Sequence, residues 1–184
     1  IMIEIVDVDD PLKLKGVNET GEICITGPNV MKGYWNKPEA TAEAFAGGRF
    51  HTGDVGYLDE EGYVFIVDRK KDMILSGGFN VYPRNIEEAI YEHPAVAECT
   101  VIGVPDEYRG QSAKAFIRLK EGAEPFTFDQ LTTFLGDKLA KYEMPVGMDI
   151  RKELPKTLIG KLSKKELVEE ERLRFEAAKG QAKG

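Results

Sequence analysis

Five consecutive charged residues, Asp68 to Asp72, divide the sequence into two halves with different hydrophobic patterns. A short apolar run, 63–67, precedes them and another, 73–75, follows, and each is short enough for one strand. A glycine pair at 77–78 then supplies a backbone that can reach positive φ, and Pro83 suits the first turn of a helix. The segment therefore predicts strand, charged joint, strand, glycine turn and helix. From the residues alone, a surface hairpin with a solvated charged turn is an equally good interpretation.

Before this joint, short apolar runs alternate with turn residues. Asp, Asn, Gly and Pro, which favour turns, interrupt the apolar runs at short intervals. The runs predict strands over 1–8, 22–27, 50–54 and 56–58, and residues 39–45 favour a short helix. This half of the chain therefore predicts a small antiparallel β module.

After the joint, the spacing of the hydrophobic residues becomes helical. Ile86, Ala89 and Ile90 share one face of a predicted helix. Thr127 and Gln130 have the spacing of a capping box, which predicts the start of a second helix. Strands are expected over 96–104, 113–120 and 148–150, and a charged helix is expected to open near Ser163 and to fade after Phe175.

These patterns together predict an α+β fold, in which a small antiparallel β module precedes a mixed α/β domain. The change of pattern at the charged segment predicts that the joint also separates two folding units. Residues 1–68 and 69–184 are expected to form these units, with a hinge at 68–72.

Composition excludes several classes of function. The 184 residues carry a formal net charge of -7, which argues against general affinity for nucleic acid or for an anionic membrane. No apolar run has membrane-spanning length and no signal peptide is visible, so we expect a cytoplasmic protein, with peripheral membrane contact left open. The chain starts in what reads as the middle of a strand, without an initiator methionine, so it is expected to be a fragment.

The cysteines predict neither a metal site nor a nucleophile. Cys24 and Cys99 lack CxxC spacing, and with two histidines in the whole chain they do not build a usual zinc site. Neither has a neighbouring base in the sequence that would activate it. Both are therefore expected in the core.

The joint and the residues after it carry a family resemblance. The segments Asp-Arg-Lys-Lys-Asp and Gly-Phe-Asn-Val-Tyr-Pro resemble the hinge motif of the adenylate-forming superfamily, which includes acyl-CoA synthetases, luciferases and adenylation domains. Within this superfamily, the two segments most resemble those of the long-chain fatty acid–CoA ligases. In that family the hinge joins a large N-terminal domain to a small C-terminal domain that swings between two half-reactions. The resemblance implies that residues 1–68 close the large domain and that 69–184 form the swinging one.

The resemblance also implies roles for single residues. Thr52-Gly53-Asp54 matches the family's Thr-Gly-Asp motif, so Asp54 would hold the ribose of ATP or AMP. A carboxylate in a turn can accept hydrogen bonds from two vicinal hydroxyls. Arg69 would contact ribose or phosphate, and Lys71 matches the hinge position. For Lys70 we expect only a place in a solvated turn.

The last motif of the family is resembled by Leu154–Lys161, in which Lys161 is the catalytic candidate. By resemblance Lys161 would stabilise the charge that grows at the substrate carboxylate and the α-phosphate. A leucine–isoleucine pair at 158–159 stands where a small or polar pair is more usual, so the loop is expected to differ in shape. The glycine loop, Gly77, Gly78 and Phe79, would line a pantetheine channel, with a simple tight turn as an equal alternative.

The expected function is that of the C-terminal part of an ATP-dependent fatty acid–CoA ligase. The parent enzyme would use ATP, Mg²⁺ and CoA to form acyl-AMP and then acyl-CoA, while the fragment, with its phosphate loop and acyl pocket upstream, would be inactive alone. Two alternatives remain: a fatty acyl-AMP ligase that loads a carrier protein, and a non-catalytic α+β interaction module. The sequence does not predict acyl chain length or oligomeric state. Exposed β edges leave dimerisation open.

Overall fold

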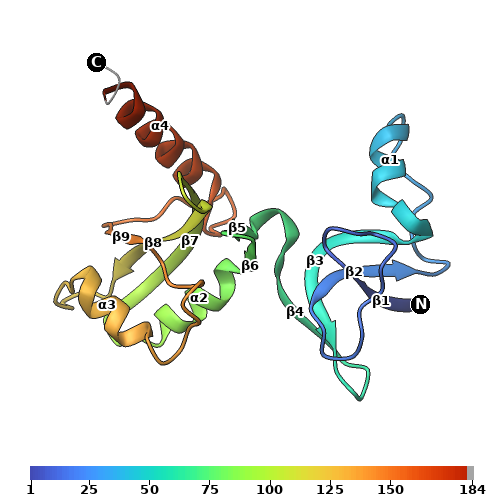
Figure 1. Ribbon diagram of the computed structural model, residues 1–184, viewed down its shortest axis with the longest axis horizontal. Coiled ribbons are helices and arrows are strands. Elements are labelled where there is room, and N and C mark those ends of the chain that lie inside the picture. The colour runs from blue at the N-terminus through green and yellow to red at the C-terminus, as the bar shows by residue number, and fades with distance from the viewer. Residues whose placement is uncertain (182–184) are drawn as a thin grey trace. The chain divides into compact units, whose positions relative to one another are not determined.

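The computed structural model describes residues 1–181, which divide into two compact units. The first unit is Ile1–Lys71 and the second begins at Asp72 (Figure 1). Both units are built on sheets that are wholly or mainly antiparallel, and α-helices accompany them. The predicted α+β fold class is therefore confirmed.

The first unit is a four-stranded antiparallel sheet with the strands in chain order. Its small core consists of buried residues from the three strands β1 to β3: Ile5, Val6, Ile23, Cys24 and Val55. The strands are β1 (Met2–Val6), β2 (Gly21–Thr26), β3 (Phe50–Leu58) and β4 (Val64–Arg69). The connection from β2 to β3 carries helix α1 (Pro38–Ala44) and a tight turn over Ala46–Gly48.

Strand β3 is continuous where the sequence predicts two shorter runs. Its pairing with β2 shifts register between Glu22 and Cys24, and its pairing with β4 shifts between Val55 and Gly56. Gly56 is required there, because a Cβ at this position would lie 2.2 Å from the backbone oxygen of Phe65. The first irregularity contains Thr52–Asp54 and the second follows directly after, so the Thr-Gly-Asp segment lies in a bulged part of β3.

The second unit is built on a five-stranded sheet in the order β6-β5-β8-β7, with β9 pairing parallel to β8. Its strands are β5 (Ile74–Ser76), β6 (Phe79–Val81), β7 (Val96–Asp106), β8 (Gly110–Leu119) and β9 (Gly147–Ile150). Its helices are α2 (Pro83–Tyr91), α3 (Phe128–Leu135) and α4 (Lys165–Gln181).

The helices of this unit start where their first-turn residues predict. Pro83 occupies the first turn of α2, whose residues Ile86, Ala89 and Ile90 are buried. The capping box is formed, with Thr127 accepting from the backbone of Gln130 and the Gln130 side chain accepting in return. Two expectations are wrong: residues 79–81 form a strand, and α4 continues beyond Phe175.

Two hydrophobic clusters hold the second unit together. The larger cluster packs α2 and α3 against the sheet. The smaller one joins Phe116 of β8 to Leu154 and to Leu167 of α4, all of which are buried. Leu154 begins the motif that ends at Lys161, so this cluster fixes the base of the lysine loop to the sheet.

Candidate functional site

The Thr-Gly-Asp segment of β3 is a bend stabilised by hydrogen bonds of the Thr52 hydroxyl. The Thr52 hydroxyl donates to the backbone oxygen of Ile23 over 2.7 Å and accepts from the backbone N–H of Asp54 over 3.1 Å. Gly53 has φ of 75°, a conformation that side chains with a Cβ rarely adopt. Glycine therefore allows the chain to bend here and to present Asp54.

Asp54 and Arg69 lie opposite one another on β3 and β4. The Nε atom of Arg69 is 2.8 Å from Oδ1 of Asp54, and the two side chains are 61% and 28% exposed. An ionised carboxylate has about four lone-pair sites, so Asp54 can bind Arg69 and still accept hydrogen bonds from a ligand. The structure thus brings together the two residues that the resemblance assigns to nucleotide contact.

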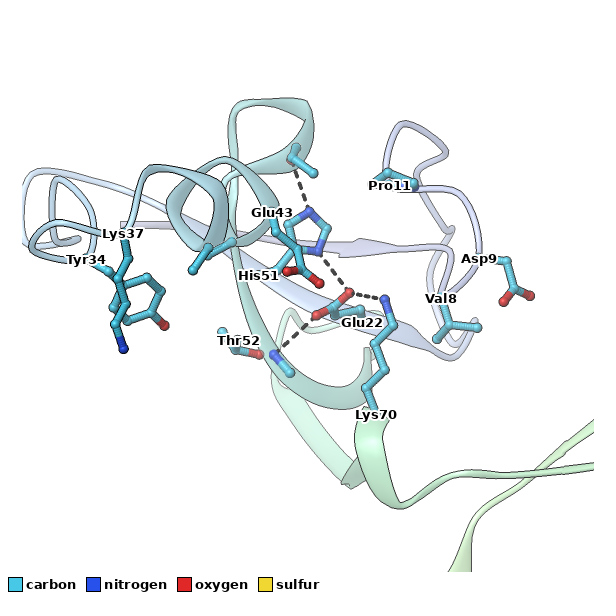
Figure 2. Close-up of a pocket in the computed structure, with 14 residues that line it drawn as sticks. Val8, Asp9, Pro11, Glu22, Tyr34, Lys37, Glu43, His51, Thr52 and Lys70 are labelled. Atoms are coloured by element: carbon cyan, nitrogen blue, oxygen red, sulfur yellow. Dashed lines mark hydrogen bonds and ion pairs between the residues drawn. The ribbon is translucent and has the colours of Figure 1, made fainter. Parts of the chain in front are cut away.

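A second polar cluster lies beside this pair and was missed by the sequence analysis. Glu22 is a buried carboxylate whose Oε2 atom is 2.8 Å from Nδ1 of His51 and 2.8 Å from Nζ of Lys70 (Figure 2). Its other oxygen accepts from the backbone N–H of Gly53 over 3.2 Å. Burial opposes ionisation of Glu22, but hydrogen bonds from Lys70 and His51 outweigh burial and lower its pKa.

Lys70 therefore does more than occupy a solvated turn, and that interpretation is wrong. Its ammonium group pairs with a carboxylate that is 3% exposed, although the Lys70 side chain itself is 40% exposed. The sequence offered little signal for this contact, because Glu22 and Lys70 are separated by 48 residues and meet only through the pairing of β2, β3 and β4.

The same cluster borders a pocket of about 670 Å³ in the first unit. Figure 2 shows Glu22, His51 and Lys70 meeting among the lining residues, which also include Tyr34, Lys37 and Glu43. Thr52 and Gly53 line the pocket, whereas Asp54 is not among its lining residues. The pocket therefore adjoins the Thr-Gly-Asp segment, but Asp54 does not line it.

Cys24 lies close to a base, which corrects the expectation from the sequence. Its Sγ atom is 3.4 Å from Nδ1 of His51. A catalytic triad binds nucleophile and carboxylate on opposite ring nitrogens, but here Glu22 shares Nδ1 with the thiol. Burial raises the pKa of Cys24 to about 12, so the thiol stays protonated at neutral pH. Cys24 and Cys99 are both buried, as expected for core residues.

The joint and the glycine loop are short turns. Lys71 lies in a 3₁₀ turn over Lys70–Asp72, and the first compact unit ends at Lys71. Gly77 and Gly78 have φ of 57° and 86° in the turn between β5 and β6. Phe79 follows them and stacks on Tyr142 with ring centroids 4.7 Å apart. The two exposed rings give the glycine loop an apolar flank.

Lys161 closes a tight loop at the end of its motif. The backbone N–H of Thr157 donates to the oxygen of Lys161 over 2.7 Å, and Gly160 turns the chain with φ of 80°. Leu158 and Ile159 are exposed at the tip. Within residues 1–181 the Lys161 side chain is exposed and makes no ion pair, whereas Lys156 in the same motif binds Glu98.

Among residues 1–181, no group of three or more His, Cys, Asp or Glu side chains is arranged to hold a metal ion. The helices described for this chain also lack the combination of length and apolar character needed to cross a bilayer.

Comparison with known proteins places this geometry in a family. Residues 85–161 match the family described as AMP-binding enzyme C-terminal domain. The long-chain-fatty-acid–CoA ligase of Bacillus subtilis is 55% identical over 153 residues, which cover 83% of this chain and 27% of that enzyme. The 2-succinylbenzoate–CoA ligase of Geobacillus kaustophilus is 49% identical, with 82% of this chain and 30% of that enzyme covered.

Solved structures agree with these relatives. The ATP-bound MatB from Rhodopseudomonas palustris is 39% identical and superposes with a TM-score of 0.84, covering 91% of this chain and 33% of that protein. The chain thus spans less than a third of the two ligases' length. The chain belongs to the adenylate-forming superfamily of acyl-CoA ligases and carries its AMP-binding enzyme C-terminal domain.

Proposed function

We propose that the whole protein is an ATP-dependent fatty acid–CoA ligase. In this proposal Asp54 binds the ribose, Lys71 is the pivot between the two domains, and Lys161 acts in adenylation. The observation that carries it is the Asp54–Arg69 pair, 2.8 Å apart on facing positions of β3 and β4 within the matching motif. The reaction would take place in the cytoplasm, where ATP and CoA are supplied.

The first half-reaction forms acyl-AMP. The carboxylate of the acid attacks the α-phosphorus of ATP, the bond to the β-phosphate oxygen breaks, and pyrophosphate leaves. Asp54 accepts hydrogen bonds from the ribose hydroxyls, and Arg69 adds a fixed positive charge near ribose or phosphate. Lys161 stabilises the negative charge that grows on the α-phosphate. Magnesium would be carried into the site on the phosphates of ATP.

The second half-reaction forms the thioester. The thiol of CoA loses its proton and attacks the acyl carbon, and the bond to AMP breaks. Gly77, Gly78 and Phe79 would line the path of the pantetheine arm, since the two glycines leave the backbone accessible and the ring offers an apolar contact. Lys71 would be the pivot of a domain rotation between the two steps. This rotation would move Lys161 away from the reacting atoms and bring the glycine loop to them.

A fatty acid is the proposed substrate because a relative named for that substrate is 55% identical. An aromatic acid is the second candidate, since the 2-succinylbenzoate–CoA ligase is 49% identical and a feruloyl-CoA synthase from Amycolatopsis is 47% identical. These identities are similar enough that the choice of acid needs a direct test.

The test is a substrate panel on the full-length enzyme. ATP-dependent pyrophosphate release would be measured with long-chain fatty acids, 2-succinylbenzoate and ferulate, and CoA thioester would be measured in parallel. We expect release with the fatty acids, followed by their CoA esters. Release with an aromatic acid alone would replace the proposed substrate. Acyl-AMP without thioester would indicate a carrier-protein acceptor, and no release with any acid would refute adenylation.

A further inference from the structure

Arg69, the last residue of β4, and Lys70, which follows it, both form ion pairs with the sheet of the first unit. Arg69 pairs with Asp54 at 2.8 Å, and Lys70 pairs with Glu22 at 2.8 Å. Lys71, which follows them, makes no ion pair or side-chain hydrogen bond within residues 1–181. Ion pairs therefore hold Arg69 and Lys70 to the sheet of the first unit, and no such contact holds the Lys71 side chain among the described residues.

Glu22, the partner of Lys70, makes several contacts with its carboxylate. Its two oxygens contact Gly53 and His51 of β3 and Lys70 of the turn after β4, so that two separate segments meet on one carboxylate of β2. Burying a charge is costly unless ion pairs and hydrogen bonds compensate it. Here the compensation is complete enough that Glu22 stays ionised, which makes it a strong acceptor for the Gly53 N–H.

The hydrogen bonds of His51 hold its ring in place. Its Nε2 atom is 3.0 Å from the backbone oxygen of Ala46, and its Nδ1 atom is 2.8 Å from the Glu22 carboxylate. Both ring nitrogens therefore have a protein partner, and the Glu22 carboxylate lies between His51 and Lys70.

We propose that Glu22 is a positioning residue for nucleotide binding. Its hydrogen bond to the N–H of Gly53 holds the backbone next to Asp54. Its ion pair with Lys70 holds the residue next to Lys71, the proposed pivot. His51 and Lys70 act through Glu22, because they hold its carboxylate in the orientation that Gly53 needs. This inference rests on the proposed function, since it assumes that Asp54 contacts ribose.

The first test follows the His51 ring in the 184-residue chain. The chain has two histidines, so ¹⁵N labelling of histidine gives an internal control. His51 contacts the Glu22 carboxylate, whereas His93 lies in the second unit. We expect the ring resonances of His51 to shift in Glu22→Gln and those of His93 to stay as in the wild type. Unchanged His51 resonances in Glu22→Gln would overturn the inference.

The second test measures ATP affinity of the full-length enzyme by calorimetry. Glu22→Gln keeps the size of the side chain and should weaken ATP binding roughly tenfold, the effect of one charge-assisted hydrogen bond. Lys70→Met should weaken it in the same direction. The double variant should be no worse than Glu22→Gln, because residues that act through one group are not additive. Glu61→Gln, an exposed carboxylate in the β3–β4 turn, is the matched control and should bind as the wild type does.

Three outcomes separate the possibilities. If Asp54→Ala binds ATP normally, the proposed role of the turn fails. If Asp54→Ala weakens binding while Glu22→Gln and Lys70→Met do not, the positioning inference alone fails. If both variants lose stability in urea but bind ATP with wild-type affinity when folded, Glu22 is only structural and the inference is again overturned. Should Glu22→Gln not fold, the ATP affinity of Lys70→Met decides.

Discussion

Asp54 is the residue on which nucleotide binding should depend most. In the full-length enzyme, Asp54→Ala should weaken ATP binding by about 10- to 150-fold, because a hydrogen bond to a charged acceptor is worth about 1.5–3 kcal/mol. Calorimetry with ATP measures this directly. Glu60→Ala, which removes an exposed carboxylate from the neighbouring turn, is the control. Unchanged affinity in Asp54→Ala would remove this residue from the site.

The two cysteines should be inert in the folded chain. Burial raises the pKa of both thiols, to about 12 for Cys24, and only thiolates react quickly with alkylating reagents. Iodoacetamide at pH 8 should therefore label neither thiol in the native chain and both in urea, as peptide mass spectrometry would show. Rapid native labelling of Cys24 would mean that His51 activates it after all.

At the residue scale, the sequence motifs predict which residues belong to the candidate site, but they do not predict which of these residues contact one another. Asp54 and Arg69 could be chosen from their motifs, but their pairing lies beyond the register shift between Val55 and Gly56. The contact of Glu22 with His51 depends on a register shift between β2 and β3. A one-residue change of register moves every side chain to the other face, so such a contact cannot be read from spacing alone.

At the scale of the element, α4 is joined to β9 and β8 by a network of ion pairs. Arg151 binds Glu170 at 2.7 Å, and Lys114 lies within 2.9 Å of Glu171 and 3.3 Å of Asp149. The hydrogen bond from Arg151 lowers the pKa of Glu170 below its ordinary 4.5. Burial opposes the ionisation of Asp149, but hydrogen bonds and charge from Arg174 and Lys114 lower its pKa below 3.8.

These lowered pKa values predict how the stability of α4 packing depends on pH. A carboxyl whose pKa is depressed by folding stabilises the native state above its unfolded pKa, and this contribution is lost as pH falls through the folded pKa. The urea midpoint followed by circular dichroism should therefore fall as pH drops below about 4.5. Glu170→Gln should lower the midpoint at pH 7 and match the wild type at acid pH. A difference that is the same at both pH values would contradict the ionic account.

Elements with strong local signals were predicted well, and short elements were not. Pro83 and the Thr127–Gln130 box mark helix starts that the structure contains. Strand β6 has only three residues, Phe79–Val81, and exists because it pairs with β5. Helix α4 passes Phe175 because ion pairs along its length, such as those of Arg172 with Glu169 and Glu176, support a weakly hydrophobic helix.

At the scale of the whole molecule, the joint should be the site of preferred cleavage. The first compact unit ends at Lys71, and Lys71 is exposed in a short turn. Brief trypsin digestion should cut after Lys70 or Lys71 and leave a folded C-terminal piece, identified by mass spectrometry. Lys70→Met should leave cleavage after Lys71. First cuts elsewhere would count against a mobile joint.

Association of the chain is a separate question at this scale. Large apolar side chains are exposed on the β strands of the first unit, among them Met2, Phe65 and Ile66. Exposed apolar strands can pair with another chain. We therefore expect self-association that grows with concentration in sedimentation experiments, and a Phe65→Lys substitution should reduce it.

In the full-length enzyme, we expect Lys161 and Lys71 to serve different half-reactions. A cation about 4 Å from a developing phosphate charge interacts by roughly 4 kcal/mol at an effective dielectric constant of 20. Lys161→Ala should therefore slow adenylation about 10²–10³-fold, the scale of losing one transition-state donor. It should leave attack of CoA on supplied acyl-AMP nearly intact. Lys71→Pro should do the reverse, because proline fixes φ at the pivot.

The most direct measurement is a pre-steady-state comparison of these variants in the full-length enzyme. Pyrophosphate release from acid and ATP reports the first step, and CoA ester formation from purified acyl-adenylate reports the second. Lys165→Ala, at the exposed start of α4, is the control. We expect loss of the first step alone in Lys161→Ala and of the second step alone in Lys71→Pro. Equal losses of both steps in both variants would contradict separate roles for the two lysines.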